Sequence, residues 1–189
     1  MTTIKKQILL FAALFALASS LSAQKFFTRD GKVKFDATAE SSPEQIEALS
    51  NTGTCVLDAA TGKMQWAVLI KNFQFEKALM QEHFNENYME STKYPNATFK
   101  GSITNLSDVN FAKDGTYKVT AKGTMTIHGV EQEISVPGTL TVGGGMVKVT
   151  ADFVVKPADY KIDIPGVVRD NIAKEIAVTI DASLKPMGK

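Results

Sequence analysis

The sequence has few of the residues that build metal centres or disulfides. One cysteine and two histidines among 189 residues exclude a Cys/His zinc finger and an intramolecular disulfide framework. The formal net charge is only +1 at pH 7, which argues against a dedicated nucleic-acid binder, because such proteins concentrate basic residues on one face. Hydrophobic residues make up 44% and charged residues 22%, a globular composition that excludes a disordered tail and a multispanning membrane protein.

Long hydrophobic runs are also scarce, and the clearest one lies near the start. Residues 1–23 have the pattern of a secretory signal peptide: Lys5 and Lys6, then an apolar run over 8–18, then small residues up to Ala23. The run is shorter than the roughly 20 residues that a membrane-spanning helix needs. We therefore predict cleavage after Ala23, a periplasmic or secreted location, and one domain over residues 24–189. A buried N-terminal helix is the alternative.

Cys55 is the lone cysteine, and in an oxidising compartment its thiol could be buried, reactive or intermolecular. It lies in the strand-like stretch GTCVLD, with no histidine nearby. We interpret it as a small buried hydrophobic residue.

The rest of the chain alternates apolar and polar residues with the period of β-strands. Short turns containing glycine separate many of the runs, so neighbouring strands are expected to pair antiparallel. About eight strands with one apolar face each indicate a closed barrel or a sandwich. Gly101, Gly123 and Gly138 fall on apolar faces, where glycines mark bends or sites at which a ligand approaches the backbone. The expected strands cover 32–37, 51–58, 64–71, 97–103, 117–127, 133–142, 146–155 and 175–184.

Residues 72–92 break this alternation. Their apolar residues recur at near-helical spacing, which predicts a short amphipathic helix at about 75–86 that lies over one mouth of the barrel. Weaker helical or loop segments are expected at 43–49 and 166–172. The spacing is carried by Phe75, Leu79, Met80, His83 and Phe84.

Motifs for catalysis or cofactor binding are missing. His83 and His128 are far apart in the sequence, and no HxH or HExxH spacing occurs. A nucleophile elbow, a phosphate loop and a dinucleotide fingerprint are absent too. We expect no enzymatic activity, no catalytic residue, no metal and no cofactor. An enzyme that uses His83 or His128 as acid or base is a less favoured alternative.

Three segments together resemble the YceI-like family of lipid- or polyisoprenoid-binding, lipocalin-like proteins. The segments are 82–103, 123–140 and 159–184, and with the early VKF strand they span almost all of the mature chain. Two departures stand out: 75–88 lacks the arginine pair that many members carry, and the late strand reads FVVKPADYKIDIP. The resemblance depends on His83, Phe84, Tyr94, Pro95, Ala97 and Phe99 in the first segment and on Gly123 and Met125 to Val130 in the second.

The resemblance implies an all-β fold, an extended eight-stranded antiparallel barrel with a short helix over one side. It also implies an apolar tunnel that holds a polyisoprenoid or another long-chain lipid. The expected function is an exported carrier or sequestering protein that binds a long apolar amphiphile non-covalently. The expected lining of the tunnel and its lid is Phe35, Trp66, Phe73, Phe75, Leu79, Met80, Phe84, Phe99, Ile103, Met125, Ile127 and Phe153.

A second function remains open, because inward aromatic residues at period two are also found in any filled barrel. In that case the protein would be a stress-response or interaction module with a solid core. A homodimer and a transient contact with a membrane are further open alternatives, whereas no nucleic-acid partner is expected. The volume and lining of the barrel interior distinguish a lipid carrier from a module with a solid core.

Overall fold

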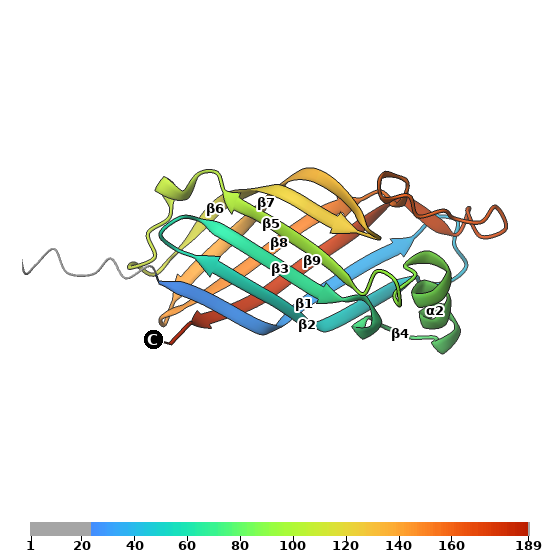
Figure 1. The fold of residues 1–189 in the computed structure, drawn as a ribbon, viewed down its shortest axis with the longest axis horizontal. Helices are drawn as coiled ribbons and strands as arrows, with labels where there is room; N and C mark the ends of the chain where they lie inside the picture. The colour runs from blue at the N-terminus through green and yellow to red at the C-terminus, as the bar shows by residue number, and fades with distance from the viewer. Residues whose placement is uncertain (1–23, 189) are drawn as a thin grey trace, which may run out of the picture.

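The structure is a computed structural model that describes residues 24–188, and the predicted signal peptide lies outside these residues. Nine strands form one antiparallel sheet in the order β1-β9-β8-β7-β6-β5-β3-β2-β4. Pairing of β1 with β2 closes eight of them into a barrel, as expected (Figure 1). The strands are β1 (Lys25–Thr38), β2 (Glu47–Asp58), β3 (Lys63–Leu69), β4 (Gln74–Phe75), β5 (Asn96–Ile103), β6 (Gly115–Ile127), β7 (Val130–Gly143), β8 (Met146–Val155) and β9 (Ile172–Pro186).

Two of the glycines on apolar faces oppose each other across β5 and β6. Gly101 pairs with Gly123. A Cβ on Gly101 would stand 2.5 Å from the Phe99 ring, and one on Gly123 would stand 2.3 Å from the Lys100 carbonyl oxygen. The two strands therefore approach each other more closely than larger residues would allow.

One end of the barrel carries short helices in place of the single helix expected at 75–86. They are η1 (Ile70–Asn72), α2 (Ala78–His83) and η2 (Phe84–Tyr88), a π-helical turn that continues α2. The start of the expected helix is instead β4, because Gln74 and Phe75 pair with Leu49 and Ala48 on β2. We call residues 70–89 the lid. No helix in residues 24–188 has the length and apolar character to cross a membrane.

The weak helical or loop expectation for 43–49 is wrong at its C-terminal part. β2 begins at Glu47, with Ala48 and Ser50 buried and Leu49 exposed between them. Pairing of this segment with both β1 and β4 explains why it is extended. The segment 166–172 is a turn up to residue 171, after which β9 begins. The 3-10 helices η3 (Leu106–Asp108) and η4 (Pro157–Tyr160) complete the connections.

The two ends of the barrel differ. The first and last described residues meet at the end opposite to the lid, where the Met187 backbone N–H donates to the Lys25 carbonyl (Figure 1). The core towards that end is solid, and it includes fully buried Leu57, Leu140, Val147 and Leu184. Cys55 belongs to the same core at 0% exposure, which confirms the expectation that it is buried. Its burial raises the pKa of the thiol to about 12.

Candidate functional site: an apolar cavity beneath the lid

The half of the barrel nearer the lid is hollow. A cavity of about 150 Å³ lies inside it, and a second cavity of about 90 Å³ lies deeper, towards the solid core. A third, of about 190 Å³, lies beneath the lid at the mouth. We call them the central, inner and mouth cavities. Together they amount to roughly 430 Å³, within the range of about 300–1,000 Å³ typical of ligand pockets.

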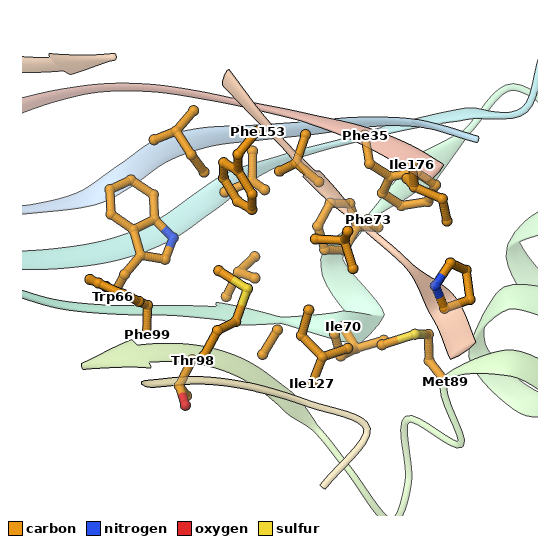
Figure 2. Close-up of a pocket in the computed structure, with 18 of the residues that line it drawn as sticks. Phe35, Trp66, Ile70, Phe73, Met89, Thr98, Phe99, Ile127, Phe153 and Ile176 are labelled. Atoms are coloured by element: carbon orange, nitrogen blue, oxygen red, sulfur yellow. The ribbon is translucent and has the colours of Figure 1, made fainter. Parts of the chain in front are cut away.

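The three cavities follow one another, because neighbouring ones share lining residues. Central and inner cavities share a constriction that includes Trp66, Phe99 and Phe153. Central and mouth cavities share Phe35, Phe84 and other residues. Figure 2 shows the central cavity with Trp66 and Phe99 at one end and Met89 at the other, beneath the lid. The arrangement is a narrow apolar passage that leads from the lid towards the solid core.

Two glycines hold Trp66 in place at the constriction. Gly31 and Gly53 face each other across β1 and β2. A Cβ on Gly31 would stand 2.8 Å from the six-membered ring of Trp66, and one on Gly53 would stand 2.9 Å from it. Only residues without a side chain leave the slot that this ring occupies.

Four phenylalanines cover the central cavity from the lid side. Phe84 of η2 packs on Phe35 of β1 at 5.3 Å between ring centroids, on Phe73 at 5.8 Å and on Phe75 at 5.1 Å. Such aromatic pairs contribute about 0.5–1.5 kcal/mol each beyond the burial of their area. The cluster holds the lid against the barrel by apolar contacts alone.

Of the three cavities, the mouth cavity alone has ionisable side chains in its lining. Glu44 and His83 help to line the mouth cavity, and Glu44 forms an exposed ion pair with Lys77 of the lid. The central and inner cavities have no ionisable side chain in their lining, and their polar side chains are threonines and Trp66. A charged group would therefore be solvated only at the mouth.

His128, at the tip of the β6–β7 hairpin, anchors the C-terminal side of the lid. Its Nε2 lies 2.8 Å from a Glu90 carboxylate oxygen, and its Nδ1 lies 3.3 Å from the Tyr160 carbonyl oxygen. The Tyr94 ring meets the imidazole edge-on at 4.7 Å. These contacts join three segments of the chain: the hairpin tip, the residues that follow the lid, and η4. The His128 ring lines none of the three cavities.

These positions leave little support for acid–base chemistry. His83 borders the mouth cavity, but within residues 24–188 no carboxylate forms an ion pair with it. His128 has a carboxylate partner in Glu90, but the imidazole lines none of the three cavities. Over residues 24–188 no group of three or more His, Cys, Asp or Glu side chains is placed to hold a metal ion.

The structure places eleven of the twelve expected lining residues on the passage. Leu79 is the exception: it is 60% exposed on α2 and lines none of the three cavities. Leu79 and Met80 are neighbours on α2 and point in directions about 100° apart, and Met80 is the one that reaches the mouth cavity. The other eleven are Phe35, Trp66, Phe73, Phe75, Met80, Phe84, Phe99, Ile103, Met125, Ile127 and Phe153. That they bind a ligand stays a prediction.

The sequence reasoning missed several lining residues. Val68, Ile70 and Ile176 lie on the same alternating faces as the expected residues, so the period-two pattern could have found them. Met89 and Ile162 come from irregular segments, and no pattern in the sequence marks them.

Comparison with known proteins agrees with this geometry. A family model described as a YceI-like domain matches residues 18–184. The fold is similar to that of a polyisoprenoid-binding domain from Saccharophagus degradans, with a TM-score of 0.74 and 13% identity over 87% of this chain and 99% of that one. It is also similar to BcnA from Burkholderia cenocepacia, with a TM-score of 0.64 and 18% identity over 82% and 95%. No curated protein is significantly similar in sequence.

Proposed function

The chain belongs to the family of YceI-like domains, and from that premise we propose that it is an exported carrier or sequestering protein for a long apolar amphiphile. The ligand is a polyisoprenoid or another long-chain lipid, and it is bound non-covalently inside the barrel, without enzymatic turnover. The observation that carries this proposal is the apolar passage of three successive cavities that begins beneath the lid.

The size and shape of the passage favour a single slender chain. Each methylene group that leaves water contributes about 0.8 kcal/mol, so a long chain has a large gross driving force from which ordering costs are subtracted. The solid core beyond Leu140 limits how deep the chain can reach.

The distribution of charge favours a chain that is neutral over its buried length. Because the central and inner cavities lack ionisable side chains, a buried phosphate or carboxylate would lose its hydration without gaining a partner. A polar or charged headgroup belongs at the mouth, near His83 and the Glu44–Lys77 pair.

Two further features support export and transfer. Residues 1–23 have the pattern of a signal peptide, which favours a periplasmic or secreted carrier. Helix α2 and the loop that precedes β9 both lie at the lid end of the barrel (Figure 1). They carry Leu79 and Val167, which are 60% and 95% exposed. Apolar side chains at the mouth of an apolar passage suit transient contact with a membrane surface, from which a lipid could enter without crossing water.

The proposal is tested on protein expressed with its leader and purified from the exported fraction. We expect organic extraction followed by mass spectrometry to find a long-chain lipid in about equimolar amount. Delipidated protein should bind the dye 1-N-phenylnaphthylamine and release it when geranylgeraniol, a 20-carbon isoprenoid alcohol, is added. Protein that repeatedly contains no lipid and binds neither probe would refute interior binding. Retention of the protein in the cytoplasm would refute export alone.

A further inference from the structure

The indole N–H of Trp66 is a buried donor with nothing to bond. Its Nε1 is inaccessible to solvent and has no hydrogen-bond partner among residues 24–188. A buried N–H is ordinarily paired, because an unpaired one has given up its hydrogen bonds to water and gains nothing in return. Packing of the six-membered ring between Gly31 and Gly53 accounts for the bulk of the indole, but it leaves the N–H without a partner.

The geometry determines which edge of the ring meets the cavity. The six-membered ring lies in the slot made by Gly31 and Gly53. In Figure 2 the nitrogen-bearing edge of Trp66 faces the central cavity. The N–H is therefore held at the constriction between the central and inner cavities, in walls that are otherwise almost wholly apolar. Because Nε1 has almost no accessible surface, an acceptor in the cavity reaches it after a small shift of the neighbouring side chains.

We propose that Trp66 Nε1–H donates a hydrogen bond to an oxygen of the bound ligand at this constriction. This inference rests on the proposed function and narrows the ligand class. The ligand is a neutral long-chain molecule with a carbonyl or ether oxygen at this depth, with apolar atoms on both sides of the oxygen. A plain hydrocarbon chain fits the same passage but leaves the donor unpaired.

The test compares ligands of equal carbon number: heptadecan-2-one, heptadecan-9-one and heptadecane, each measured by displacement of 1-N-phenylnaphthylamine. We expect at least one ketone to bind about three- to tenfold more tightly than heptadecane, the advantage that a net neutral hydrogen bond confers. The sequence has a single tryptophan, so an NMR spectrum shows one indole N–H signal. That signal should move downfield with the preferred ketone and not with heptadecane.

Substitution separates the N–H from the shape of the ring. In Trp66→Phe the ratio of ketone to heptadecane affinity should fall to about one. Leu69→Ala is the control: Leu69 lies on the same strand, is exposed and lines none of the three cavities, so this variant should keep the parent ratio. Should Trp66→Phe fail to fold, benzothienylalanine at position 66 replaces the N–H by sulfur with the same ring shape, and it should give the same loss.

The outcomes distinguish this inference from the proposed function. If the ketones and heptadecane bind equally and leave the indole signal at one position, the hydrogen bond is refuted and interior binding stands. If a ketone preference survives removal of the N–H, Trp66 is not its source, and the inference is again refuted. If none of the three displaces the dye, the proposed function itself fails.

Discussion

Blocking the central cavity is the sharpest test of where a ligand binds. Ala97, on β5, lines the central cavity and packs against the buried cluster beneath the lid. In Ala97→Phe the added phenyl ring would project into the central cavity of about 150 Å³. A ligand entering from the lid could then reach neither the central nor the inner cavity.

The lost volume sets the size of the effect. The two cavities together offer roughly 240 Å³, room for about eight groups of ~30 Å³, the volume that a water molecule takes in the liquid. At about 0.8 kcal/mol for each methylene, the gross loss is about 6 kcal/mol. Part of this loss in binding free energy is offset, because a ligand that is bound over a shorter length loses less conformational entropy. We therefore expect geranylgeraniol to bind at least about a hundredfold more weakly, which corresponds to ~2.8 kcal/mol.

The fold should survive, since the ring enters existing space. We expect the melting temperature to stay within about 4 °C of the parent's, equivalent to ~1 kcal/mol for a domain of this size. Ala67→Phe is the matched control: the residue lies between Trp66 and Val68 on β3, on the outer face, and lines no cavity found in residues 24–188. It should bind like the parent. An Ala97→Phe variant that is folded and binds geranylgeraniol at full affinity would exclude the central and inner cavities as the binding site.

Three further predictions follow from the lid, the core and the mouth. Phe84→Ala removes the ring that contacts three other phenylalanines. We expect the free energy of unfolding to fall by about 3 kcal/mol, the low end for this substitution, because Phe84 is only half-buried. Dissociation of the dye, followed by stopped-flow, should be at least about fivefold faster, and an unchanged rate would show that the lid does not gate release. Cys55 should resist a thiol reagent in the native protein and react once unfolded, because its thiol is buried and its pKa is raised to about 12. As the folded pKa lies above the unfolded value of about 9, this group's contribution to stability is complete below pH 9 and declines as the pH rises towards 12, which denaturation at several pH values can follow; rapid native labelling would contradict the burial. Leu79→Glu with Val167→Glu should slow lipid transfer from phosphatidylcholine vesicles severalfold while dye binding without vesicles is kept, and equal transfer rates would exclude contact through these residues.

The barrel could be predicted because its signal is repeated in every strand. Apolar residues at every second position mark the face of the strand that is buried. Short turns between strands favour antiparallel pairing of neighbours. The lid could be predicted only in outline. Its spacing near Phe84 is helical, but pairing of Phe75 with Ala48 on β2 overrides helix formation at its start, and such a contact between distant segments leaves no local trace.

The hollow half of the barrel could not be predicted from alternation, which is the same in both halves. Leu57, Val147 and Leu184 fill one end, whereas the central cavity lies nearer the lid. Whether a section of the barrel is filled or hollow depends on which side chains from different strands lie beside one another, and therefore on the register of the strands. A single sequence indicates period but carries only weak information on register between strands distant in the chain.

The central cavity has a cost that argues for an occupant. An apolar void costs about 24 cal/mol for each Å³, so a void of about 150 Å³ lowers stability by roughly 4 kcal/mol. That is a large part of the 5–15 kcal/mol that stabilises a typical domain. The solid core around Leu57, Leu140 and Leu184 supplies packing that lets the barrel tolerate the void. If a lipid chain enters beneath the lid as proposed, it would restore the lost contacts, and binding of the lipid would then raise the stability of the fold.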